Sequence, residues 1–85
     1  MKIFAIHDSK SEMYSNISVH PATGHASRAF QDAVNSGQGV LSSHPEDFTL
    51  FELANFDEKT GKIVPLTPAK VVCNGVDVKL VQDAA

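Results

Sequence analysis

The chain has 85 residues, which predicts one domain over residues 1–85, because so short a chain cannot bury two independent cores. Hydrophobic residues make up 42% and charged residues 20%, a composition typical of a globular protein. No apolar run approaches the roughly 20 residues that cross a bilayer, so we expect no membrane partner. Seven basic and ten acidic residues give a net charge of −3, and the scattered bases disfavour tight non-specific binding of duplex DNA.

The ends of the chain and its cysteine content bear on location. The segment Met1–Ile6 is followed at once by His7 and Asp8, so it lacks the apolar core of a signal peptide. Cys73 is the single cysteine and has no partner for an internal disulfide, which is consistent with a reducing compartment. We therefore expect a cytoplasmic protein.

The first half of the chain predicts two strands. In residues 2–7, apolar side chains alternate onto both faces, which indicates a strand inside a sheet. Residues 8–11 are rich in Asp and Ser and predict a turn. Residues 14–19 then predict a second, more exposed strand.

One helix follows, with Thr23 as its expected N-cap and Gly37 as its expected C-cap. The positions i, i+3, i+4, i+7 and i+8 carry one apolar stripe. Its members are Ala26, Ala29, Phe30, Ala33 and Val34. Because this stripe is rich in alanine, the helix can approach a sheet closely, with Phe30 as the main anchor.

The second half predicts a loop over residues 36–43 and then the longest strand, over 48–56, with apolar residues on both faces. Residues 57–61 predict a hairpin loop that leads to a partner strand over 62–66, where Pro65 favours a sheet edge.

The C-terminal part is expected to break at Thr67 and Pro68. Asn74 and Gly75 then predict a two-residue hairpin between strands over 71–73 and 76–80. We expect residues 82–85 to fray.

These elements predict an α+β fold in which a single helix packs on one face of an antiparallel β-sheet. The order would be β-β-α-β-β plus a C-terminal hairpin or strand. The other face would stay partly apolar, which favours a homo-oligomer.

The residues that could carry chemistry are dispersed. His20 and His25 lie five positions apart across Pro21 and do not form a zinc-binding pair, so we expect no metal and no cofactor. Cys73 follows two valines, which is typical of a small buried side chain, not of an activated nucleophile. The sequence therefore predicts a protein without catalytic residues, not an enzyme.

Four segments carry a resemblance to a known family: residues 3–10 (IFAIHDSK), 28–35 (RAFQDAVN), 44–53 (HPEDFTLFEL) and 56–62 (FDEKTGK). In order and spacing they resemble the small nonstructural protein of gokushovirus-type microviruses, which are single-stranded DNA phages. The resemblance implies a nonstructural role in phage genome replication, at the stage of single-stranded DNA synthesis, in the host cytoplasm. It supplies no catalytic residues.

We therefore expect an accessory protein that binds single-stranded DNA, viral or host replication proteins, or both. The candidate nucleic-acid-binding residues are Lys10, Tyr14, Arg28, Phe51, Lys59 and Lys62, with the cations on phosphates and Tyr14 or Phe51 stacked on bases. The alternative is a protein-interaction module that recruits or inhibits a host or viral factor without touching nucleic acid.

Overall fold

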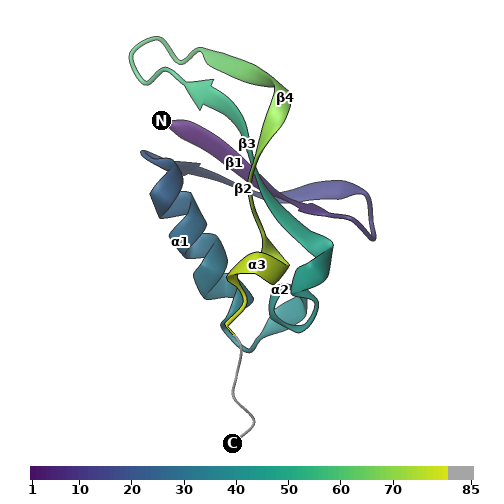
Figure 1. Ribbon diagram of the computed structural model, residues 1–85. Helices are drawn as coiled ribbons and strands as arrows, with labels where there is room; N and C mark the ends of the chain where they lie inside the picture. The colour runs from purple at the N-terminus through teal and green to yellow at the C-terminus, as the bar shows by residue number, and fades with distance from the viewer. Residues whose placement is uncertain (81–85) are drawn as a thin grey trace, which may run out of the picture.

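The computed structural model of the chain describes residues 1–80 (Figure 1). Its elements in chain order are β1 (Lys2–Asp8), β2 (Met13–His20), α1 (Thr23–Val34), α2 (Gly39–Ser43), the 3₁₀ helix η1 (Pro45–Asp47), β3 (Phe48–Phe56), β4 (Ile63–Asn74) and α3 (Gly75–Val78). No helix in this part of the chain is long and apolar enough to span a membrane.

The four strands form one antiparallel sheet in the order β2-β1-β3-β4. The central strands, β1 and β3, are those whose apolar residues alternate onto both faces, and β3 has the predicted bounds. The edge strands, β2 and β4, are the more exposed ones. Pro65 lies in β4, as expected of an edge strand, because it has no N–H to donate to a neighbour.

The core lies between α1 and one side of the sheet. It consists of Phe4 and Ile6 from β1, Phe48 and Leu50 from β3, and Ala26, Phe30 and Val34 from α1. The predicted helical stripe supplies three of these residues, and Phe30 is its largest buried side chain, at 3% exposure. Burying a phenylalanine of this kind contributes about 1.5–3 kcal/mol to stability.

The predicted arrangement with a single helix is wrong. Two further helices, α2 and α3, join α1, and Figure 1 shows all three grouped below the crossing of the strands. The expected loop over 36–43 contains α2, because Leu41 packs against the core and the Ser42 hydroxyl accepts a 3.0 Å hydrogen bond from the Gly37 N–H. Contacts of this kind cannot be recognised in the sequence. A helix of five residues is also too short to show a periodic apolar pattern.

The predicted C-terminal hairpin is also wrong. β4 continues through Thr67 and Pro68, opposite a break in the β3–β4 pairing between Glu52 and Ala54, and Gly75 begins α3. Gly75 is buried, with its backbone against Pro45, so tertiary packing overrides the turn preference of Asn-Gly. The predicted fraying of residues 82–85 lies outside the described residues.

The start of α1 follows the prediction, but Thr23 does not cap it. Ala22 holds the N-cap position, without a side-chain hydrogen bond. Thr23 instead accepts a 3.2 Å hydrogen bond from Lys2 Nζ and donates a 3.5 Å one to Glu52 Oε1. Glu52 is 4% exposed, and Lys2 Nζ lies 3.7 Å from the same carboxylate oxygen, so a cation and a hydroxyl compensate its buried charge.

The segment after α3 joins the three helices. Lys79 Nζ donates to the carbonyl oxygens of Val34 and Ser42, each at 3.1 Å, at the ends of α1 and α2. Asn35 donates to the Val78 carbonyl oxygen at 3.0 Å and accepts from the Leu80 N–H at 2.8 Å. The bonds from Lys79 and from the Asn35 amide group occupy carbonyl groups that the helix ends leave without partners.

Gly75→Ala is expected to lower the free energy of unfolding by about 1–3 kcal/mol, the usual effect of overpacking. The added Cβ would lie 3.2 Å from the Phe48 carbonyl oxygen and closer still to the carbonyl of Pro45, and both are backbone groups. The matched control is Gly24→Ala in α1, where nothing lies within 4 Å of the new atom. Urea denaturation should show the control unchanged or stabilised; equal effects of both changes would contradict the packing assigned to Gly75.

Candidate functional site

The sheet has one face against the core and one face directed away from it, which we call the open face. Strand pairing places its members side by side: Ala5 pairs with Phe51, Phe51 with Val71, and His7 with Tyr14. Several of its apolar side chains are exposed: Ile17 (74%), Val71 (53%), Tyr14 (49%) and Val19 (48%). The open face is therefore an apolar surface that water reaches.

His7, Tyr14 and Phe51 form an aromatic cluster on this face, one residue from each of β1, β2 and β3. The Tyr14 and Phe51 rings meet edge to face, with centroids 5.5 Å apart, and the His7 ring lies 4.7 Å from Tyr14 and 6.0 Å from Phe51. Pairs of this geometry contribute about 0.5–1.5 kcal/mol beyond their buried area. The cluster holds its rings in fixed positions, and half of Tyr14 stays accessible to a ligand.

The two predicted stacking residues, Tyr14 and Phe51, are thus brought together. His7 is a member that sequence reasoning did not select. The sequence contained the information needed to select it. His7 lies two positions after Ala5 in the first strand, and residues two apart in a strand share a face.

The predicted cationic residues do not converge. Lys10 lies in the β1–β2 turn, where Asp8 pairs with Phe48, whereas Lys59 and Lys62 lie in the hairpin beyond Phe56. The nine residues of β3 separate these ends by roughly 30 Å at about 3.4 Å per residue.

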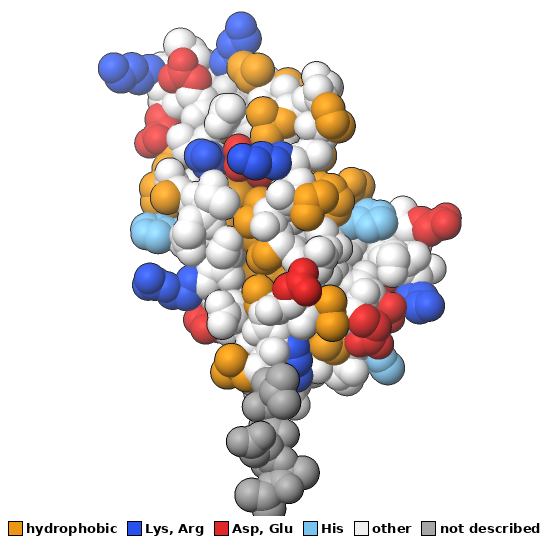
Figure 2. Space-filling model, viewed as in Figure 1, with side chains coloured by type: hydrophobic (Ala, Val, Ile, Leu, Met, Phe, Trp, Pro, Cys, Tyr) orange, Lys and Arg blue, Asp and Glu red, His pale blue; other side chains and the backbone are white. Residues whose placement is uncertain are grey.

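Arg28 lies on α1, across the sheet from the aromatic cluster. Figure 2 shows cationic side chains next to acidic ones over this view of the molecule, not gathered into one basic patch. Lys10, Arg28 and the pair Lys59 and Lys62 therefore lie in separate parts of the molecule and do not form one phosphate track.

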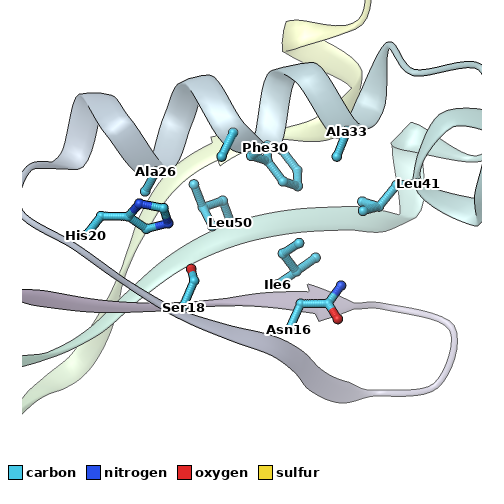
Figure 3. Close-up of a pocket in the computed structure, with 10 residues that line it drawn as sticks. Ile6, Asn16, Ser18, His20, Ala26, Phe30, Ala33, Leu41 and Leu50 are labelled. Atoms are coloured by element: carbon cyan, nitrogen blue, oxygen red, sulfur yellow. The ribbon is translucent and has the colours of Figure 1, made fainter.

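A cavity of about 320 Å³ opens between α1 and β2, on the side of the sheet opposite the aromatic cluster (Figure 3). Three polar side chains of β2 line it, from Asn16, Ser18 and His20. Its other walls are apolar. Sequence reasoning did not find this cavity, because it depends on how β2 bends away from the helix.

His44, Glu46 and Asp47 place potential metal-ligand atoms within 4.8 Å of one another around η1. His44 Nδ1 lies 3.4 Å from Glu46 Oε1, and both side chains are exposed. A hydrogen bond with its own backbone holds the pKa of Glu46 below its usual value, and His44 acts in the same direction. The three residues are near neighbours in sequence around one turn, and exposed acidic groups of this kind are common in proteins without a metal ion.

Cys73 packs partly against the core, and its burial raises the pKa of its thiol. A raised pKa leaves less thiolate near neutral pH, which is the opposite of what a nucleophile requires. We therefore expect iodoacetamide at pH 8 to alkylate Cys73 several-fold more slowly in the folded protein than in urea. Mass spectrometry would follow the reaction, and equal rates in both conditions would show that the thiol is neither buried nor depleted of thiolate.

Comparison with known proteins identifies the family. A family profile described as Phage ORF5 protein matches residues 1–78. No curated protein and no solved structure matches the chain significantly. The expected resemblance to a phage protein is thereby confirmed, whereas the narrower assignment to gokushovirus-type microviruses stays a prediction. The chain belongs to the Phage ORF5 protein family and is a bacteriophage protein.

Proposed function

We propose that this phage accessory protein acts in genome replication, by associating with single-stranded DNA, with the replication complex, or with both. The observation that carries the proposal is the aromatic cluster of His7, Tyr14 and Phe51 on the open face. Single-stranded nucleic acid exposes unpaired bases, and these stack on accessible aromatic rings at about 1–3 kcal/mol per base. The sequence resemblance to a nonstructural protein of single-stranded DNA phages points in the same direction.

The architecture suits base stacking. Some nucleic-acid-binding modules present aromatic side chains on a four-stranded antiparallel sheet, where successive bases lie flat on the strands. In this chain the cluster spans three neighbouring strands, and Ile17 and Val71 extend the apolar surface around it. A strand bound here would rest on the two central strands and one edge strand.

Electrostatics sets the expected strength of binding. The net charge is −3, and the predicted phosphate contacts are Lys10 at one end of the sheet and Lys59 and Lys62 at the other. With three phosphate contacts, a plot of log Kd against the logarithm of salt concentration would have a slope of only about 2. Affinity would therefore come more from stacking than from charge.

Tyr14→Leu is expected to weaken binding to a fluorescein-labelled oligothymidine by about 5- to 150-fold in Kd, because it removes the ring but keeps an apolar side chain. The control is His25→Ala, which removes an exposed ring from α1, away from the open face. Fluorescence anisotropy at low and at high salt measures both. Absence of binding by the unmodified protein at low salt would end the DNA version of the proposal.

A second candidate function is favoured by the exposure of Ile17, Val19 and Val71. Three apolar side chains, each about half exposed or more, are typical of a surface that another protein covers. The partner would be a host or viral factor that the phage protein recruits or inhibits, and a second copy of the chain could occupy the same face. In this version the open face buries apolar surface against protein and makes no contact with nucleic acid.

Ile17→Lys separates this second function from the first. The side chain is 74% exposed, so the change should leave folding intact while it places a charge in the middle of any apolar contact. We expect the unmodified protein to increase in mass with concentration in sedimentation equilibrium, and Ile17→Lys to abolish that increase. Val76→Lys on α3, at a site 57% exposed, is the matched control. A monomer mass for the unmodified protein at all concentrations would remove the homo-oligomer.

A further inference from the structure

The side chains of β2 alternate in the reverse of the usual sense. A strand with one face toward a core normally turns its apolar side chains inward and its polar ones outward. In β2, Asn16, Ser18 and His20 turn toward α1 and the cavity (Figure 3). Ile17 and Val19 do not line the cavity and are exposed, and Val19 lies opposite Ile3 in the pairing with β1. The polar side of this strand is therefore directed at a cavity that is open to water, with Asn16 exposed and Ser18 and His20 half-buried.

A β-bulge produces this arrangement. The β1–β2 pairing shifts between Phe4, opposite Ser18, and Ile6, opposite Ser15. Asn16 lies in the extra stretch with a φ of 54°, a left-handed conformation that asparagine tolerates better than most residues. Bulges bend the strand and redirect side chains, and they occur often beside binding sites.

The wall of the cavity opposite β2 is apolar and consists largely of small side chains. Ala26, Ala29 and Ala33 face it from α1, and Ile6 and Leu50 lie beneath it (Figure 3). The small alanine side chains leave room that larger residues would fill. At about 320 Å³, the space is near the lower limit of small-molecule sites and suits a fragment no larger than a nucleoside.

The polar side chains that line the cavity have hydrogen-bonding capacity to spare. Within residues 1–80, no side-chain hydrogen bond engages Asn16, Ser18 or His20. Among the aromatic rings of residues 1–80, the His20 ring contacts that of Phe4, in an edge-to-face arrangement with centroids 5.7 Å apart. An amide, a hydroxyl and an imidazole thus offer donors and acceptors along one line, at alternate positions of a single strand.

We propose that this cavity binds a nucleobase. The polar edge of the base would bond to Asn16, Ser18 and His20, and its apolar faces would contact the alanine wall of α1. A purely apolar side chain from a partner would cover the three polar groups without giving them hydrogen bonds, which costs about 1–3 kcal/mol for each group left dry. A flat ring with a polar edge satisfies both kinds of wall.

The base can come from a free nucleotide or from a DNA strand, and the strand version rests on the function proposed above. β2 is an edge strand, with Tyr14 directed to one side of the sheet and Ser18 to the other. The four chain steps from Tyr14 to Ser18 span at most roughly 14 Å. A short strand could therefore stack one base on Tyr14 and turn another around the sheet edge into the cavity.

The test is a titration of the ¹⁵N-labelled full chain with each of the four deoxynucleosides, followed by amide chemical shifts. We expect shifts at Ser18, His20 and Ala29 with a Kd on the order of 1 mM for at least one base. Ala29→Leu fills the cavity and should abolish them, and Asn16→Gly, which keeps the left-handed backbone, should weaken them. Gln31→Leu, exposed on α1 outside the cavity, is the matched control and should leave them unchanged.

The two proposals can fail separately. Absence of shifts at the cavity with every nucleoside, or shifts that persist in Ala29→Leu, would overturn the base site even if the protein binds single-stranded DNA through Tyr14. Nucleoside binding without anisotropy change on oligothymidine or a mixed-sequence oligonucleotide would support the cavity, assign it to free nucleotides and end the strand version. Oligonucleotide binding weakened by both Tyr14→Leu and Ala29→Leu would assign the base to a strand.

Discussion

The contact between the alanine-rich side of α1 and the residues Phe4 and Leu50 of the central strands decides the rest of the structure. Small side chains let the helix approach β1 and β3, and Phe30 fills the space between them. Because β1 and β3 occupy the middle of the sheet, this contact fixes which side of every strand faces the core. The open face and the cavity beside β2 are both consequences of a helix that covers part of one side.

The two candidate binding surfaces differ in their chemistry. The open face is a flat apolar area with three aromatic rings, which suits stacking or association with protein. The cavity is small and has one polar wall. Both involve β2, and neither lies beside a cluster of lysines. Recognition by this phage protein would depend on shape and on unpaired ring surfaces more than on attraction between opposite charges.

Elements with a clear pattern of apolar residues could be predicted from the sequence, whereas β4, the longest strand with 12 residues, was predicted as two segments because Thr67 and Pro68 suggested a break. The period of the apolar residues gave the face of α1 that packs against the sheet, and the apolar run gave the bounds of β3. Alternation placed Tyr14 and Phe51 among the accessible aromatic residues. The helices α2 and α3 have five and four residues, too few for a period, and form through Leu41 and Val78 against the core. The bulge at Asn16 was equally hidden, because its position is set by the pairing of Phe4 and Ile6 with different parts of β2.

The strand order has a consequence for how the chain reaches its native state. Phe4 and Ile6 lie between a neighbour in sequence, β2, and a distant strand, β3, where Phe4 pairs with Glu52. During synthesis on the ribosome, the first hairpin emerges long before the strand that completes its environment. Such non-local pairing slows folding, since a long loop must close before its contacts form. The nascent chain consequently exposes the apolar side chains of β1, including Phe4 and Ile6, until β3 has left the exit tunnel.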